Sequence, residues 1–171
     1  IDAVRDIRGM AYFAPDASDV PFPTVECPSY EQGCESKEDY ARSVKIQYDQ
    51  ADHVRGKAIT QVHGKRVLIQ NPPSKPLTTE EMDKVYALPF ARTYHPSYDA
   101  VGGVPAIQEV QFSIIHNRGC FGACNFCALA FHQGRYISAR SHDSVVHEAE
   151  QTAQHPDFKG YIHDVGGPTA N

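Results

Sequence analysis

Three of the chain's five cysteines lie close together, in the spacing C-x-x-x-C-x-x-C. They are Cys120, Cys124 and Cys127, and an apolar segment over residues 109–115 runs almost directly into them. Cysteines at this density serve as thiolate ligands of a metal more often than they serve packing. A set of three also leaves one coordination position for a further ligand. The sequence therefore predicts a metal centre on the loop that follows a buried strand.

The segments around this loop predict a strand–loop–helix–strand unit. Residues 109–115 and 161–165 read as short apolar strands, and residues 141–154 have the N-cap and first-turn acid of a helix. The apolar face expected on that helix consists of Val145, Val146, Ala149 and Ala153. Strands joined through a helix are parallel, so the loops after both emerge at one edge of the sheet, where ligands bind. We therefore expect Gly166 and Gly167, which follow the second strand, to share a pocket with the cysteine loop.

Residues 1–105 have a different character, and we interpret them as an α+β accessory segment. The first predicted elements are a strand within residues 6–13 and a short helix after Ser29 that Gly33 interrupts. A longer helix is predicted over residues 37–52, with an apolar stripe of Tyr40, Val44, Tyr48 and Ala51. A hairpin of residues 58–62 and 66–70 around Gly64 follows, and then a helix over residues 79–87 capped by Thr78 and Glu81. Residues 89–106 are irregular and aromatic, which is typical of a functional loop or of a strap that seals a domain boundary. The fold class is α/β, and we divide the chain into residues 1–105 and residues 106–171.

Composition excludes several classes of protein. The 171 residues include 16 Lys and Arg against 21 Asp and Glu, a formal net charge of −5. This balance argues against a nucleic-acid-binding surface, although a nucleic-acid substrate in a local pocket stays open. No apolar run approaches the ~20 residues of a membrane span, and clustered cysteines in odd number favour a reducing cytoplasm. Because the chain opens at Ile1 and stops shortly after a Gly-Gly-Pro turn, we expect it to be a piece of a longer protein.

The ligand set alone leaves the metal open between an iron–sulfur cluster and zinc. Cys124, Cys127 and His132 give the opening of a zinc knuckle, and Cys120 would complete a Cys3His set. Ile137, however, stands where the knuckle's next cysteine belongs. We favour the cluster, because a structural zinc site does not need the carboxyl end of a buried strand. The alternatives are a zinc-stapled binding module without catalysis and an iron–sulfur electron-transfer protein.

Five separated stretches resemble the YgiQ family of radical S-adenosylmethionine (SAM) proteins. They are NPPSKPLTTEEMD, LPFARTYHPSYD, RGCFGACNFCAL, HQGRYISARS and FKGYIHDVGGPTAN, and the resemblance runs from about residue 7 to the end of the chain. It implies a Rossmann-like domain ahead of this region. It also implies that residues 106–171 form the N-terminal part of a TIM-like barrel, the remainder of which follows.

The resemblance implies a cofactor and roles for individual residues. Cys120, Cys124 and Cys127 match the three protein ligands of a 4Fe–4S cluster whose fourth iron binds SAM, and Phe126 matches the aromatic residue that flanks the adenine. A one-electron reductant is then needed to cleave SAM to methionine and a 5′-deoxyadenosyl radical, which abstracts hydrogen from a substrate that the sequence does not identify. That radical chemistry belongs to the cofactors, while the protein supplies ligands, orientation and exclusion of water.

Two further groups are implied to hold SAM. Gly166 and Gly167 match a turn that contacts the methionine amino group, although Pro168 and Thr169 stand where the family usually has a carboxylate. Arg140 is expected to balance the cluster's charge or to hold the SAM carboxylate. The same role is open to Arg118, Arg135 and Ser138. Asp164 is expected to cap the glycine turn, and His132 and His163 are expected to have structural roles. Cys27 and Cys34 are expected to be ordinary free thiols.

Overall fold

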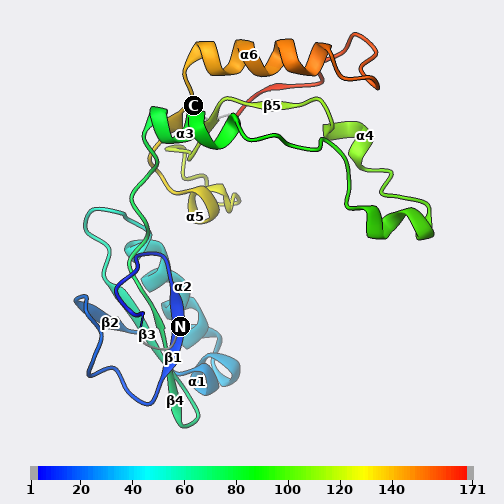
Figure 1. Ribbon diagram of the computed structural model, residues 1–171. Helices are drawn as coiled ribbons and strands as arrows, with labels where there is room; N and C mark the ends of the chain where they lie inside the picture. The colour runs from blue at the N-terminus through cyan, green and yellow to red at the C-terminus, as the bar shows by residue number, and fades with distance from the viewer. Residues whose placement is uncertain (1–3, 169–171) are drawn as a thin grey trace. The chain divides into compact units, whose positions relative to one another are not determined.

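The computed structural model describes residues 4–168 and divides the chain into two compact units, Ile1–Pro76 and Leu77–Asn171 (Figure 1). Both units combine helices with small sheets, so the general α/β class is confirmed. The predicted division between residues 105 and 106 differs from the boundary between these compact units, and it stays a prediction.

The first unit is a four-stranded sheet with two helices. Its strands are β1 (Ala11–Ala14), β2 (Thr24–Glu26), β3 (Ala58–His63) and β4 (Arg66–Gln70), in the order β1-β4-β3-β2. The β2–β3 pair is parallel and the other two pairs are antiparallel. The strand predicted within residues 6–13 corresponds to β1, which is shorter and begins later, at Ala11.

The predicted hairpin is confirmed. His63 pairs with Arg66, so Gly64 and Lys65 form a two-residue turn between β3 and β4. Gly64 has a φ of +57°, in the left-handed region that glycine adopts without a steric cost.

Helix α1 (Tyr30–Glu35) begins with the predicted capping box. The Ser29 hydroxyl accepts a hydrogen bond from the backbone N–H of Gln32, and the Gln32 side chain accepts one from the backbone N–H of Ser29 at 2.8 Å. Gly33 does not interrupt the helix, contrary to expectation. One glycine costs a helix about 0.5–1 kcal/mol relative to alanine, and a good N-cap contributes about as much.

The apolar stripe predicted for α2 (Lys37–Gln50) is partly wrong as a packing face, although Ser36 caps the helix as predicted. Tyr40 is 64% exposed and Val44 is exposed, Tyr48 and Ala51 are half-buried, and Ser43 is buried. The buried face is therefore offset by one position. A small side chain there fits against the unit, and the Ser43 hydroxyl is satisfied by a carbonyl one turn earlier.

Replacing Gly33 with alanine should stabilise α1 by about 0.5–1 kcal/mol, because the backbone is already helical and no atom lies within 4 Å of the added methyl group. Hydrogen exchange of the α1 amides measures the change. The matched control is Gly64→Ala, which also meets open space but has a positive φ and should destabilise its hairpin. Equal effects of the two substitutions would contradict the prediction.

The second unit contains short helices and two separate strand pairs. Its elements are α3 (Thr79–Tyr86), the 3-10 helix η1 (Pro96–Val101), α4 (Ile107–Val110), β5 (Ile114–Ile115), β6 (Asn117–Arg118), α5 (Leu129–Gln133), β7 (Ser138–Ala139), α6 (His142–Ala153) and β8 (Val165–Gly166). The capping box of Thr78 with Glu81 and the N-cap at Ser141 are confirmed.

The predicted parallel strand pair is confirmed, but both strands are shorter than expected. Ile114 pairs with Val165 and Ile115 with Gly166, and α6 lies between them in the chain. Residues 107–110 form α4 instead of extending the strand. The apolar residues that predicted a strand are buried at Phe112 and Ile114. A strand extends only as far as a partner supplies hydrogen bonds, and β8 supplies two residues.

The apolar face predicted for α6 is partly wrong. Val146 and Ala153 are exposed, and Glu148 and Thr152 are buried instead. A glutamate takes a core position here because two arginines neutralise it, as described below.

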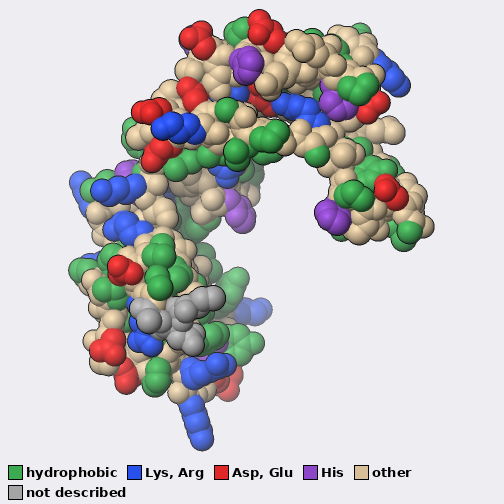
Figure 2. Space-filling model, in the orientation of Figure 1, with side chains coloured by type: hydrophobic (Ala, Val, Ile, Leu, Met, Phe, Trp, Pro, Cys, Tyr) green, Lys and Arg blue, Asp and Glu red, His purple; other side chains and the backbone are tan. Residues whose placement is uncertain are grey.

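The surface carries charges of both signs. On the face shown in Figure 2, acidic and basic side chains are interspersed and do not gather into one basic patch. Within residues 4–168, no helix is both long enough and apolar enough to span a membrane.

Candidate functional site

The cysteine loop is closed at its base by a short antiparallel ladder. β6 pairs with β7, with Asn117 opposite Ala139. The backbone N–H of Cys120 donates to the carbonyl of Gly134 at 3.0 Å, which adds a hydrogen bond beyond the two residue pairs of this ladder. Residues 119–137 therefore leave the fold and return to it at one place, which we call the root of the loop.

Gly119 makes this closure possible. Its φ is +87°, and a Cβ at this position would overlap the carbonyl oxygen of Tyr136. Its backbone N–H donates to Oε1 of Gln133 at 3.1 Å. The two chain segments of the root approach so closely that only glycine fits.

The three cysteines of the loop differ in exposure. Cys120 is 6% exposed, Cys124 is exposed and Cys127 is half-buried, and all three are free thiols. The backbone N–H of Cys127 donates to the Cys124 carbonyl at 3.0 Å, which forms a tight turn between them. The preceding Ala123 has a φ of +45°, a conformation that costs a non-glycine residue energy.

The chemistry of this donor set fits an iron–sulfur cluster, because three free thiols on one loop supply three thiolate ligands. Within residues 4–168, no three His, Cys, Asp or Glu side chains are arranged to hold a metal ion. Convergence of Cys120, Cys124 and Cys127 on one centre therefore stays a prediction. The same is true of a zinc set completed by His132, which is exposed on α5.

The Gly166-Gly167 turn lies beside the root of the cysteine loop, and Gly166 is the last residue of β8 rather than following the strand as predicted. The backbone N–H of His116 donates to the carbonyl of Gly166 at 3.0 Å. A Cβ on Gly167 would overlap the side-chain amide of Asn117, the first residue of β6. The turn and the root thus meet through Asn117.

Asn117 is a residue that sequence reasoning missed. It is 3% exposed, and its Nδ2 has no hydrogen-bond partner among the described residues. A buried amide donor without a partner is costly, so an acceptor is expected at this junction when a ligand is bound. The amino-acid part of SAM offers a carboxylate of the required kind. No spacing or composition signal marks this asparagine in the sequence.

Arg140 is engaged within the fold. Its guanidinium donates to the carboxylate of Glu148, to the carbonyl of Ile115 at 2.9 Å and to Ser144, and it stacks 4.3 Å from the ring centre of Tyr86. Only 1% of its side chain is exposed. Contact of Arg140 with a cofactor stays a prediction, whereas these contacts support a structural role.

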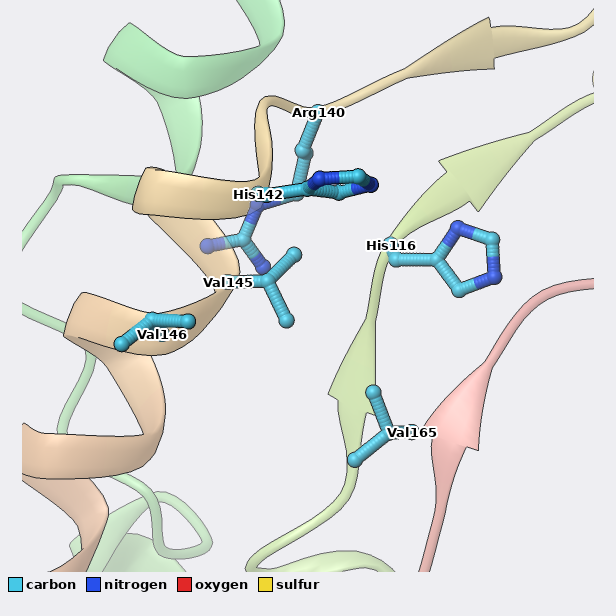
Figure 3. A pocket seen from close by; sticks show the side chains of 6 residues that line it. All are labelled: His116, Arg140, His142, Val145, Val146 and Val165. Atoms are coloured by element: carbon cyan, nitrogen blue, oxygen red, sulfur yellow. The ribbon is translucent and has the colours of Figure 1, made fainter.

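A cavity of about 400 Å³ lies next to this arginine. The residues that line it are His116, Arg140, His142, Val145, Val146 and Val165 (Figure 3). In Figure 3 the valine side chains come from α6 and β8, while His116 lies just beyond β5. The cavity is therefore lined by valines of α6 and β8 together with His142, the first residue of α6, and it reaches His116, which precedes Asn117.

The remaining predicted residues have varied surroundings. Ser138 is buried and donates to the carbonyl of Leu77 at 2.7 Å, which is a structural contact. Arg118, Arg135, His163 and Asp164 are exposed, and the Asp164 carboxylate lies near Gly166. Cys27 and Cys34 are free thiols as predicted, and burial raises the pKa of the Cys27 thiol. Thr169, one of the two residues that stand where the family usually has a carboxylate, lies outside the described residues.

Comparison with known proteins identifies the family. The family model described as radical SAM N-terminal matches residues 1–113. A UPF0313 protein of Clostridium botulinum (strain Kyoto / Type A2) is 55% identical over 171 residues, which is 100% of this chain and 26% of the relative. A UPF0313 protein of Clostridium perfringens (strain SM101 / Type A) is 48% identical over 168 residues, 98% of this chain and 25% of the relative. No solved structure matches the chain. The chain thus spans about a quarter of the length of these curated relatives, and it belongs to the radical SAM N-terminal family and to the YgiQ family that its motifs indicated.

Proposed function

We propose that this chain is the cofactor-binding part of a radical SAM enzyme. Cys120, Cys124 and Cys127 would hold a 4Fe–4S cluster, with SAM bound at the fourth iron. The observation that carries the proposal is the meeting of the cysteine loop's root with the Gly166-Gly167 turn at the end of a parallel strand pair. Family membership supports the cofactor class, since radical SAM proteins in general use this cluster and SAM.

The chain's own residues would bind and orient the cofactors. The β6–β7 ladder and Gly119 fix where the loop starts. The three thiolates would then be brought together when the cluster binds. The Asn117 amide has a donor to offer at the glycine turn. Phe126 is 92% exposed, and its ring has room to lie against an adenine. When bound, the cluster and SAM supply the one-electron cleavage that starts hydrogen abstraction from the substrate.

The wider architecture belongs to the same proposal. We infer that β5, α6 and β8 are the first βαβ unit of a TIM-like barrel that longer relatives complete, and that residues 1–105 are the accessory segment ahead of it. The substrate is not identified by any residue described here, and the reductant is a one-electron donor. We place the protein in the cytoplasm because free, clustered thiols need a reducing compartment.

Anaerobic reconstitution of the full-length protein with iron and sulfide tests this function. We expect a 4Fe–4S absorbance band, a reduced-state electron paramagnetic resonance (EPR) spectrum that changes when SAM is added, and release of 5′-deoxyadenosine. Stoichiometric zinc with no iron uptake would overturn the proposal in favour of a structural zinc module. A cluster whose spectrum ignores SAM would instead indicate electron transfer.

A further inference from the structure

We propose that Glu148 is a positioning residue that holds the root of the cysteine loop in place through Arg140. The inference rests on the proposed function for its significance, but its structural basis is independent of any cofactor. It assigns a role to a residue that touches neither the cysteines nor the glycine turn in the contacts described above.

Glu148 sits between two arginines in the interior of the second unit. Its Oε1 accepts a hydrogen bond from Arg92 at 2.7 Å, and its Oε2 accepts one from Arg140. Only 7% of the Glu148 side chain and 14% of the Arg92 side chain are exposed. Buried charges of this kind are tolerated only when paired, so each arginine depends on this carboxylate.

Arg140 transmits this anchoring to the strand that leads into the loop. One of its Nη atoms donates both to Glu148 and to the carbonyl of Ile115, the last residue of β5. Its backbone N–H donates to the carbonyl of His116 at 2.8 Å. The side chain and the backbone of one arginine therefore fix two consecutive residues immediately before β6.

Arg92 adds a second anchor from a segment far away in the sequence. It lies in the irregular stretch of residues 89–106 and has a φ of +51°. A non-glycine residue keeps this costly conformation only where its surroundings hold it. The Glu148 carboxylate is the group that holds the Arg92 side chain, so the same residue ties the irregular stretch to α6.

Glu148→Gln in the full-length, cluster-free protein tests the inference through thiol accessibility. Glutamine keeps the size of the side chain, but it removes the counter-charge and turns one acceptor into a donor that faces an arginine. Iodoacetamide labelling of each cysteine is followed by mass spectrometry of the peptides. We expect the labelling rate of Cys120 relative to Cys124 to rise by at least about tenfold, because the root that buries Cys120 is released.

Two controls separate positioning from general destabilisation. Cys27 is buried in the first unit, so its labelling rate should stay unchanged, and a rise in step with Cys120 would overturn the inference in favour of global unfolding. Glu150→Gln removes an exposed carboxylate from the same helix and should leave all labelling rates unchanged. An unchanged Cys120 rate in Glu148→Gln would also overturn the inference.

A milder variant covers the case in which Glu148→Gln does not fold. Ser144→Ala removes the hydroxyl that accepts hydrogen bonds from the Arg140 guanidinium. The Ser144 carbonyl and Glu148 still hold that guanidinium, so Cys120 labelling should rise by only about fivefold, the factor for a loss of about 1 kcal/mol. No change in this variant would count against the inference.

The final measurement separates this inference from the proposed function. In reconstituted protein, we expect Glu148→Gln to release iron to a chelator at least about tenfold faster than wild type. A wild-type protein that takes up no cluster would overturn the proposed function, while the labelling experiment would still decide whether Glu148 holds the root. A wild type that binds the cluster with a variant that releases iron at the same rate would overturn the positioning role alone.

Discussion

Cys124→Ala in the full-length protein is expected to abolish the 4Fe–4S absorbance and to lower the rate of SAM cleavage by at least about a hundredfold. This loss exceeds the usual loss of activity when a residue that only hydrogen-bonds to a metal ligand is replaced. In the proposed site a cluster with three protein ligands cannot spare one of them, because the fourth position would be taken by SAM. Iron and sulfide analysis, with assay of 5′-deoxyadenosine, provides the measurement.

The position of Cys124 allows its side chain to be removed with little effect on the rest of the fold. The side chain is exposed, so its removal should leave the fold and thermal stability nearly unchanged. Cys34→Ala is the matched control, since Cys34 is also exposed but lies in the first unit, outside the loop. The control should keep full iron content and activity. Wild-type iron content in Cys124→Ala would show that the cysteine is not a ligand.

Gly119→Ala has the largest expected effect on stability. A positive φ costs a residue with a Cβ about 1–2 kcal/mol, and overlap with the Tyr136 carbonyl should add about 1–3 kcal/mol. Hydrogen exchange of the amides in residues 114–119 and 134–140 of the full-length protein reports the local opening free energy. We expect it to fall by the sum of the two terms, with a parallel loss of cluster retention.

Gly134 provides the matched control for this prediction. Its φ is +82°, close to that of Gly119, but an added Cβ meets no atom within 4 Å. Gly134→Ala adds no overlap, and its conformational cost should be at least that of a left-handed residue because its ψ is 173°. A loss in Gly119→Ala that exceeds the loss in Gly134→Ala therefore reports the overlap at the root. Equal losses in both variants would show that the close approach of Tyr136 does not constrain the loop.

Local chemistry explains which elements were predictable. The capping boxes at Ser29 and Thr78 and the Gly64 turn depend on residues within a few positions of each other, so short sequence patterns reveal them. The parallel pairing of β5 with β8 followed from the strand–helix–strand order, although the strand lengths did not. The cysteine spacing similarly marked the loop but not the exposure of each thiol.

Helix faces and buried polar residues were less predictable. The buried faces of α2 and α6 differ in part from the apolar stripes predicted for them. A prediction from apolar periodicity places serine and glutamate on the solvent-facing side of a helix. Ser43 is buried because it is small, and Glu148 is buried because Arg92 and Arg140 neutralise it. Arg92 is distant in sequence, so no window of neighbouring residues contains the reason for the burial of Glu148.

The sequence by itself determined the family, the three candidate thiolate ligands and the parallel unit that carries them, since each depends on residue identity and spacing along the chain. Only the tertiary structure decided what surrounds them. The Asn117 amide against Gly167, the Tyr136 carbonyl against Gly119 and the Glu148 carboxylate between two arginines all join residues that are separated along the chain. Their physical basis is close packing and charge pairing in a buried volume, which exist only once the chain has folded.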